Sequence, residues 1–200
     1  MNMKKAVIYI HGKGGNAGEA ARFKTLFPER DILGFDYRAQ TPWEAKDEFT
    51  SYFAGVCEKY DSVWLIAESI GAFFAMQAGV DAKIGKAYFI SPVVDMEKLV
   101  ADMLVWENAT ENELKEKKEI KTASGETLSW DYLLYVRENP VQWSVPTRIL
   151  YGGNDALTSF ETISGFARKS GAELCVMPGG EHWFHTPEQM EFLYDWMKKT

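Results

Sequence analysis

This sequence has no long hydrophobic run, only two cysteines and no excess of basic residues. No apolar run approaches the roughly 20 residues that a membrane-spanning helix needs, so no membrane span is expected. The first apolar stretch, Ala6 to Ile10, is followed directly by His11. It is shorter than the roughly 7 to 15 residues in the hydrophobic region of a signal peptide. This stretch therefore predicts a first strand rather than a secretion signal.

Charge and cysteine usage narrow the range of functions further. The chain has 22 basic and 29 acidic residues, a formal net charge of −7. This balance argues against nucleic-acid partners, which need a basic surface. The two cysteines, Cys57 and Cys175, lie far apart and form no CxxC pair. That spacing is typical of reduced thiols and favours a cytoplasmic protein over a disulfide-stabilised one.

The rest of the composition suits a single globular domain. Of 200 residues, 46% are hydrophobic and 26% are charged. This balance supports one packed core and argues against disorder or a coiled coil. We therefore expect one domain over residues 1–200.

Short runs of β-branched and aromatic residues alternate with longer segments of helical spacing, which is a βαβ pattern. Several runs are almost continuously apolar, as strands covered by helices on both faces must be. The sequence predicts an α/β fold with a mostly parallel central sheet of about six strands and helices on both faces. The expected strands are Ala6–Ile10, Asp31–Phe35, Ser62–Ala67, Lys86–Ile90, Thr147–Tyr151 and Glu173–Val176.

Two helices have clear sequence signals. Thr41-Pro42-Trp43-Glu44 offers a helix N-cap, a proline in the first turn and a glutamate three residues after the cap. The C-terminal segment after Pro187 repeats the helical spacing of apolar residues. The inward stripe expected behind Thr41 consists of Ala45, Phe49, Tyr52, Phe53, Val56 and Tyr60.

The alternation breaks between about residues 93 and 143. Helical pieces at Met96–Glu107 and Glu111–Lys118 precede a turn signal at Thr122–Glu126 and an aromatic run at Trp130–Val136. About 50 residues therefore stand where about a dozen suffice to connect parallel strands. We expect a cap or lid-like insertion, whose apolar residues would either cover a pocket or form ordinary packing.

A serine stands at one of the predicted strand-to-helix junctions. The strand ending at Ala67 runs into Glu68-Ser69-Ile70-Gly71 and then into a helical stretch. A nucleophile elbow needs small residues two before and two after its serine, because the strained turn leaves no room for side chains there. Ala67 replaces the usual first glycine. A helix N-cap is the simpler interpretation of Ser69 on its own.

An acid and a histidine follow two later strands. Gly152-Gly153-Asn154-Asp155 comes after one of them, and Gly179-Gly180-Glu181-His182 comes after the next. Serine, acid and histidine thus occur in order at the carboxyl ends of successive strands, where open α/β sheets bind ligands. Asp155 alone would fit an ordinary turn, and Asp95 is the alternative acid.

The predicted first strand ends in His11-Gly12-Lys13-Gly14-Gly15, a turn whose backbone can approach a bound carbonyl oxygen. These glycines do not fit G-x-G-x-x-G, because residue 17 is alanine, and no Walker motif occurs. Nucleotide binding is therefore not favoured.

Together, these features resemble the α/β-hydrolase superfamily, in particular a small serine esterase. The resemblance rests on the His11-Gly12 turn, Ala67-x-Ser69-x-Gly71, Gly152-x-x-Asp155 and Gly180-x-His182. It implies that Ser69 is the nucleophile, that His182 is the general base and acid, and that Asp155 orients the histidine. Two strands that usually precede the His-Gly turn in this family are missing, so a trimmed sheet is expected.

The resemblance also implies an oxyanion hole made by the backbone N–H groups of Lys13 and Ile70. His182 is preferred to His11 and His185 as the base, because it follows a predicted strand in the right order. No metal and no organic cofactor is implied. Candidate residues of a substrate pocket are His11, Trp183, Met96, Met103 and Trp106.

A serine hydroxyl is a weak nucleophile at neutral pH, and these residues would activate it. A serine hydroxyl must lose its proton as it attacks a carbonyl, and a histidine with a pKa near 6.5 can accept it. We expect a serine hydrolase that cleaves a carboxylic ester or thioester of a small to medium substrate. The alternatives are a non-catalytic ligand- or protein-binding module, because fold does not fix function, and a peptidase or carbon–carbon hydrolase with the same residues.

Overall fold

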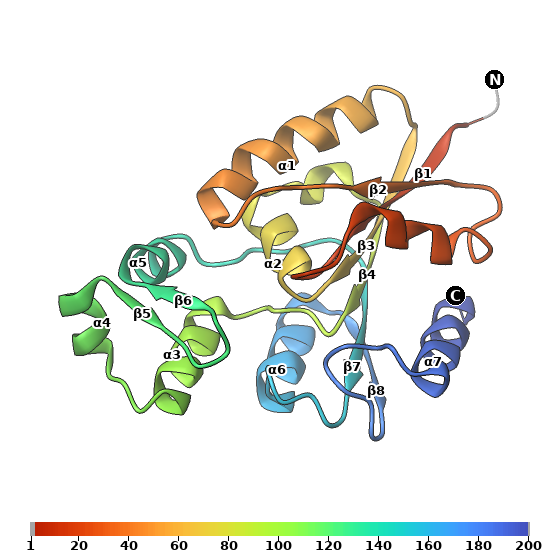
Figure 1. Ribbon diagram of the computed structural model, residues 1–200. Helices are drawn as coiled ribbons and strands as arrows, with labels where there is room; N and C mark the ends of the chain where they lie inside the picture. Colours follow the sequence, from red (N-terminus) through yellow and green to blue (C-terminus); the bar gives the residue numbers. More distant parts are fainter. Residues whose placement is uncertain (1–2, 200) are drawn as a thin grey trace.

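A computed structural model describes residues 3–199, and its centre is the expected sheet of six parallel strands (Figure 1). The spatial order of the strands is β2-β1-β3-β4-β7-β8. Each strand lies within one or two residues of its predicted bounds, so the predicted fold class is confirmed. The strands are β1 Lys5–Ile10, β2 Asp31–Phe35, β3 Ser62–Glu68, β4 Lys86–Ile90, β7 Thr147–Gly152 and β8 Glu173–Met177.

The central strands form because almost every side chain on them can be buried. Residues 6–10 of β1 have no exposed surface, and all six residues of β7 are buried. A parallel sheet needs this composition because helices cover both of its faces. Strand β8 lies at the edge of the sheet, and its Val176 is 36% exposed.

Helices pack on both faces of the sheet, as expected (Figure 1). One face carries α1, α2 and α6, and the other carries the 3₁₀ helix η1 together with α7. A short 3₁₀ helix, η2, precedes β4. The bounds are η1 Ala17–Phe23, α1 Pro42–Cys57, α2 Ile70–Gln77, η2 Asp81–Lys83, α6 Phe160–Ser170 and α7 Pro187–Lys198.

Helix α1 begins as its sequence signals predict. The Thr41 side chain accepts a hydrogen bond from Glu44 N, and the Glu44 side chain accepts one from Thr41 N, which completes a capping box. The expected stripe is buried at Ala45, Phe49, Phe53 and Val56. Tyr52 and Tyr60 are half-buried against the same core, although the helix ends at Cys57, before Tyr60. The Tyr60 hydroxyl donates to Asp31 Oδ2 at 2.8 Å.

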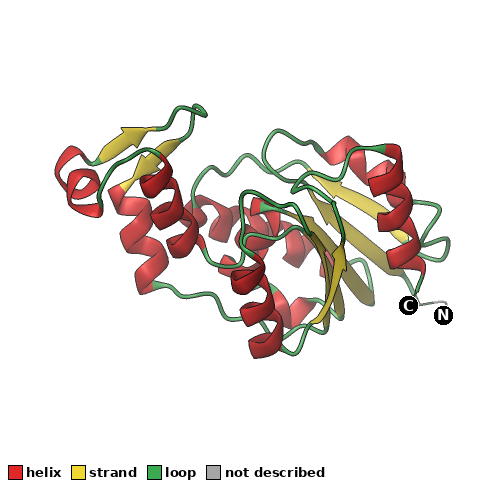
Figure 2. Cartoon of the chain, turned by 90° about the horizontal axis from the view of Figure 1, so that it is seen from below, coloured by secondary structure: helices red, strands yellow, loops and turns green. Residues whose placement is uncertain are grey.

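Five elements fill the long connection between β4 and β7 and lie to one side of the sheet (Figures 1 and 2). They are α3 Met96–Trp106, α4 Glu111–Lys117, β5 Glu119–Lys121, β6 Thr127–Ser129 and α5 Trp130–Glu138. The expected turn closes with a hydrogen bond from Thr122 N to Glu126 O, and β5 and β6 around it form an antiparallel hairpin. Helix α5 rests against the start of α1, where the rings of Trp43 and Tyr135 lie 5.3 Å apart.

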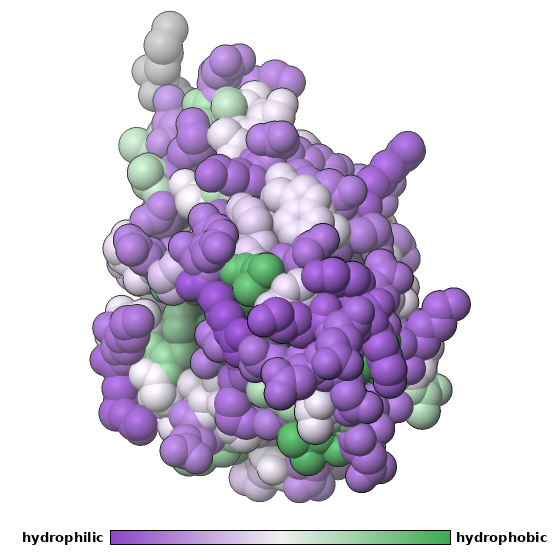
Figure 3. Space-filling view, turned by 90° about the vertical axis from the view of Figure 1, so that its left-hand side faces the viewer, coloured by the Kyte–Doolittle hydropathy of each residue, from purple (hydrophilic) through white to green (hydrophobic). Residues whose placement is uncertain are grey.

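The side of the molecule formed by this connection is mainly hydrophilic, with hydrophobic residues in small separate patches (Figure 3). Its most exposed apolar side chains are Val105, Trp106 and Leu134. None of the helices in the described part of the chain is both long and apolar enough to cross a membrane. Cys57 and Cys175 are both free thiols.

Gly34 and Gly55 differ in how much space the surrounding atoms leave for a side chain. A Cβ added to Gly34 in β2 would lie 2.0 Å from Ala17 O, whereas one added to Gly55 in α1 would meet nothing within 4 Å. We expect Gly34→Ala to lower the free energy of unfolding by about 1–3 kcal/mol or more. Gly55→Ala should raise it by about 0.5–1 kcal/mol, because alanine favours the helix. Urea unfolding measures both, and equal effects would contradict this packing.

Candidate active site

The order of the strands places a topological switch point at the carboxyl edge of the sheet, between β1 and β3. The chain leaves β1 toward η1 on one face and leaves β3 toward α2 on the opposite face, although β1 and β3 are paired neighbours. Ligands of open α/β sheets bind at such switch points. The loop at residues 11–16 and Ser69 both lie at this point.

Ser69 occupies a strained turn between β3 and α2. Its backbone has φ 49° and ψ −122°, a conformation that is costly for any residue other than glycine. A Cβ on Gly71 would lie 2.5 Å from His11 O, so only glycine allows α2 to start this close to the end of β1. Ala67, fully buried in β3, does not prevent this turn. The backbone therefore has the form of a nucleophile elbow.

The structure brings Ser69, His182 and Asp155 into one hydrogen-bonded chain. Ser69 Oγ lies 2.8 Å from His182 Nε2, and His182 Nδ1 lies 2.7 Å from Asp155 Oδ2. An ionised carboxylate can only accept, so Nδ1 carries the ring proton and donates it to Asp155. Nε2 is then free to accept the hydrogen of the Ser69 hydroxyl.

Asp155 is held as a carboxylate although its side chain has no exposed surface. Burial alone raises the pKa of such a group, but the hydrogen bond and charge of His182 and the backbone N–H groups of Thr158 and Leu157 outweigh it. Those N–H groups donate to Oδ1 at 3.0 and 2.8 Å, and the Thr158 hydroxyl donates to Oδ2 at 3.1 Å. The pKa of Asp155 consequently lies below its ordinary value.

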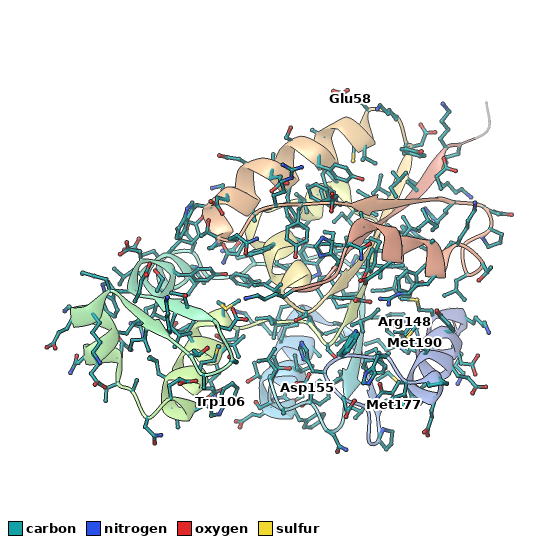
Figure 4. All side chains as sticks on the ribbon, in the orientation of Figure 1. Glu58, Trp106, Arg148, Asp155, Met177 and Met190 are labelled. Atoms are coloured by element: carbon teal, nitrogen blue, oxygen red, sulfur yellow. The ribbon has the colours of Figure 1, made fainter. Side chains whose placement is uncertain are left out.

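Close backbone contact places the acid and the histidine side by side. A Cβ on Gly152 would lie 2.4 Å from Glu181 O, so the loops after β7 and β8 can touch only because this residue is glycine. Asn154 N donates to Gly180 O at 2.8 Å and ties the two loops together. Figure 4 shows Asp155 near the lower edge of the sheet, with Arg148 farther up, toward the start of β7.

The alternative acid has a different task. Asp95 is the N-cap of α3 and accepts a hydrogen bond from Lys98 N at 2.9 Å. It makes no hydrogen bond with His182 among the described residues. The geometry therefore places Asp155, and not Asp95, behind the histidine.

Two backbone N–H groups adjoin Ser69 without a partner among the described residues. Ile70 is the first residue of α2, so its N–H has no acceptor within the helix. Lys13 N makes no hydrogen bond in the described chain, and it follows Gly12, whose added Cβ would lie 3.3 Å from Ser69 Cβ. The Lys13 side chain is 61% exposed and forms an ion pair with Glu126 of the β5–β6 turn.

His11 is buried beside this loop. Its Nδ1 donates to Gly12 O at 2.8 Å, and its ring stacks on Tyr37 with centroids 4.4 Å apart. The Tyr37 hydroxyl donates to His11 O at 3.0 Å. His11 Nε2 is buried without a hydrogen-bond partner in the described chain. These contacts show that His11 holds the loop in shape.

The other candidate pocket residues are scattered. Trp183 is 68% exposed and stacks on His185, and Trp106 is 52% exposed at the end of α3. Met103 is half-buried, and Met96 is buried. Met96 lines a cavity of about 890 Å³ between α3, α5 and α6, of which Ser69, His182 and Asp155 are not part. Among the described residues, no hydrogen bond or ring contact joins any of these four side chains to Ser69, His182 or Asp155.

Sequence reasoning missed two residues near the site. Thr158 follows Asp155 by three residues, a spacing that allows a hydroxyl to reach back to a carboxylate. Glu126 meets Lys13 across 113 residues of sequence, and no local pattern announces such a contact. In the described part of the chain, no group of three or more His, Cys, Asp or Glu side chains could hold a metal ion.

Comparisons with solved structures decide the fold family. Est1E from Butyrivibrio proteoclasticus superimposes with a TM-score of 0.74 at 18% sequence identity, over 99% of this chain and 87% of that one. Alpha/beta hydrolase domain-containing protein 10 from mouse gives a TM-score of 0.76 at 16% identity, over 98% and 90%. This chain has the α/β-hydrolase fold.

A third α/β-hydrolase-like match is an esterase of Pyrococcus furiosus, with a TM-score of 0.60 at 19% identity, over 98% of this chain and 80% of that one. No protein-family model and no curated protein matches the sequence. The expected α/β-hydrolase fold is confirmed by these structures.

The hydrogen bonds to Asp155 predict a specific acid sensitivity. A carboxyl group whose pKa is lowered by folding stabilises the protein above its unfolded-state pKa, about 3.9, and this contribution is lost as the pH falls through the folded-state value. We expect the stability difference between wild type and Asp155→Asn to shrink as the pH is lowered from about 5 to about 3. Urea unfolding across this range measures it.

Asp47→Asn removes an exposed carboxyl of α1 and supplies the background for this titration. A difference between wild type and Asp155→Asn that stays constant with pH would contradict the assigned environment.

Proposed function

We propose that this protein is a serine hydrolase that cleaves a carboxylic ester, or a thioester, through an acyl-enzyme intermediate. The observation that carries the proposal is the chain from Ser69 Oγ through His182 to the buried Asp155, with contacts of 2.8 and 2.7 Å, at a strained elbow. This arrangement pairs a nucleophile with a base and the base with a group that orients it.

In the first half of the reaction, Ser69 Oγ attacks the substrate carbonyl carbon while His182 Nε2 takes its proton. Asp155 stabilises the imidazolium that forms. The carbonyl oxygen becomes an oxyanion, which accepts hydrogen bonds from the N–H groups of Lys13 and Ile70. When the tetrahedral intermediate collapses, His182 returns the proton to the departing alcohol or thiol, and the acyl group stays on Ser69.

The second half releases the acid. A water molecule attacks the acyl carbon and gives a proton to His182. The same two N–H groups meet the second oxyanion. Collapse of this intermediate breaks the bond to Ser69 Oγ, which regains its proton from His182. All the groups that these steps need are supplied by the chain and by water.

Fold neighbours support an ester more than another acyl derivative. The matched structures include an esterase of Pyrococcus furiosus, a marine microorganism esterase and Est1E with ferulic acid bound. A proline iminopeptidase-related protein from Thermus thermophilus also matches, at 17% identity. Because fold does not fix function, a direct assay identifies the leaving group.

The connection at residues 93–143 is proposed to act as a cap inserted in a single domain over residues 1–200. Its hairpin reaches the loop after β1 through the ion pair between Glu126 and Lys13. Its helix α5 packs Tyr135 on Trp43 at the start of α1. The cap thus contacts the side of the sheet where Ser69 lies, and it would limit the substrate to a small molecule.

The nucleophile is tested with Ser69→Ala in an assay with p-nitrophenyl acetate and butyrate. We expect turnover to fall by roughly 10⁴-fold or more, because the nucleophile is lost, while the circular dichroism stays that of the wild type. Ser91→Ala is the matched control. Like Ser69, Ser91 has a positive φ, 41°, at the end of a strand, the neighbouring β4, but it is buried and its Oγ has no hydrogen-bond partner in the described chain.

A fluorophosphonate probe separates an enzyme from a binding module, because it labels only an activated serine. Labelling of the wild type that disappears in Ser69→Ala and in His182→Ala, and persists in Ser91→Ala, is the expected result. If the probe does not label the wild-type protein and the protein hydrolyses no ester or thioester, the proposed function is wrong.

A further inference from the structure

A second hydrogen-bonded chain lies on the opposite side of the elbow from His182 and is not used by the reaction as written. Glu68 immediately precedes Ser69, and side chains alternate between the two faces of a strand. Glu68 Oε2 lies within hydrogen-bonding distance of the Tyr9 hydroxyl, at 3.0 Å, and Oε1 accepts a hydrogen bond from Arg22 Nη2. Glu68 therefore links the elbow to β1 and to η1.

The same tyrosine reaches the loop after β1. Its hydroxyl lies 2.7 Å from Glu19 Oε2. Glu19 Oε1 accepts a hydrogen bond from Asn16 N at 3.3 Å and lies 3.1 Å from the position of an added Cβ on Gly15. The Glu19 carboxylate thus rests directly against the loop that carries Lys13.

We propose that Tyr9, Glu19 and Glu68 form a positioning unit that fixes the two halves of the oxyanion hole relative to each other. One half, Ile70 N, lies two residues after Glu68. The other half, Lys13 N, lies in the loop that Glu19 supports. The inference rests on the proposed function, because it assigns a role to residues that do not touch the reacting atoms.

The positions of the protons decide whether Tyr9 can form hydrogen bonds with Glu19 and Glu68 at the same time. A phenol has one hydrogen, so both contacts of Tyr9 with carboxyl groups are satisfied together only when one of these groups holds a proton. Burial raises the pKa of Glu68, although Arg22 and Tyr9 work against this, and Glu19 adds to it. The raised pKa makes the protonated form of Glu68 more accessible than that of a solvated glutamate. Tyr9 and, from η1, Glu19 and Arg22 are the charged or titratable groups that act on it.

A purely structural role would be to hold η1 against the sheet. That task is already carried out by Ala20 and Phe23, which η1 buries in the core on this face. The hydrogen bond from Asn16 N to Glu19 completes the capping box at the start of η1, and the contacts of Glu19 with Gly15 and Asn16 also restrain the loop at residues 11–16. Fixing the oxyanion hole would affect kcat and leave KM nearly unchanged, whereas holding η1 against the sheet would not affect kcat selectively.

Tyr9→Phe removes the central hydroxyl and keeps the ring. We expect kcat for p-nitrophenyl butyrate to fall by roughly ten-fold with KM within about two-fold, because a displaced oxyanion donor acts in the transition state and a complete loss costs roughly 10²–10³-fold. Tyr88→Phe is the matched control. Tyr88 is a fully buried tyrosine in the same core, and its hydroxyl has no partner among the described residues, so both constants should stay unchanged.

Glu68 and Glu19 supply independent variants. Glu68→Gln keeps a group of the same shape that can both donate and accept, and it should retain kcat within about three-fold, whereas Glu68→Ala should lose as much as Tyr9→Phe. Glu19→Ala breaks the unit at its loop end. Its side chain is 31% exposed, so this variant should fold even if a buried change at Tyr9 prevents folding.

Hydrogen exchange of the loop supplies a readout that does not depend on catalysis. Amides of residues 11–16 should exchange at least roughly three-fold faster in Tyr9→Phe and Glu19→Ala than in wild type or Tyr88→Phe, because the loop has lost a restraint. If the wild type shows no Ser69-dependent turnover, the proposed function fails, and this measurement still decides the positioning role. Wild-type exchange of the loop in Tyr9→Phe and Glu19→Ala, or a wild-type kcat in both, overturns the inference.

Discussion

The pairing of β1 with β3 is the constraint on which the candidate site depends. Ile10 is paired with Ala67, so the two strands end side by side, and the chain continues from them in opposite directions. This register places Gly12 against Ser69, and Gly71 against the backbone of the first loop. A shift by one residue would turn every side chain of one strand to the other face and would separate the loop from the serine.

Two carboxyl groups stand on either side of this junction in opposite electrostatic environments. Asp155 is buried but has backbone, hydroxyl and imidazole donors for its oxygens, so the charged form is favoured. Glu68 is largely buried, and burial, with a contribution from Glu19, raises its pKa although Arg22 and Tyr9 oppose this. The donors around Asp155 outweigh the effect of its burial, whereas those around Glu68 do not. One carboxyl orients the ring of His182, and the other connects Tyr9 with Arg22.

Much of the fold follows from local sequence patterns. The runs at residues 87–90 and 149–152 are apolar throughout, and such strands are stable only inside a sheet covered on both faces. The start of α1 follows from Thr41 and Glu44, whose side chains satisfy the first backbone N–H groups. The β5–β6 hairpin was not predicted beyond its turn. Its strands have three residues each, which is too short for an alternating pattern to be visible.

The sequence by itself determined the residue types of the candidate site and their order along the chain, because a strained turn and a close loop contact require glycine or alanine at particular spacings. Only the tertiary structure decided which acid lies behind His182, since both Asp95 and Asp155 follow a strand and differ in what their side chains meet. It alone also joined Lys13 to Glu126 and Tyr9 to Glu68. Contacts between residues far apart in sequence depend on strand order and register, which no local pattern encodes.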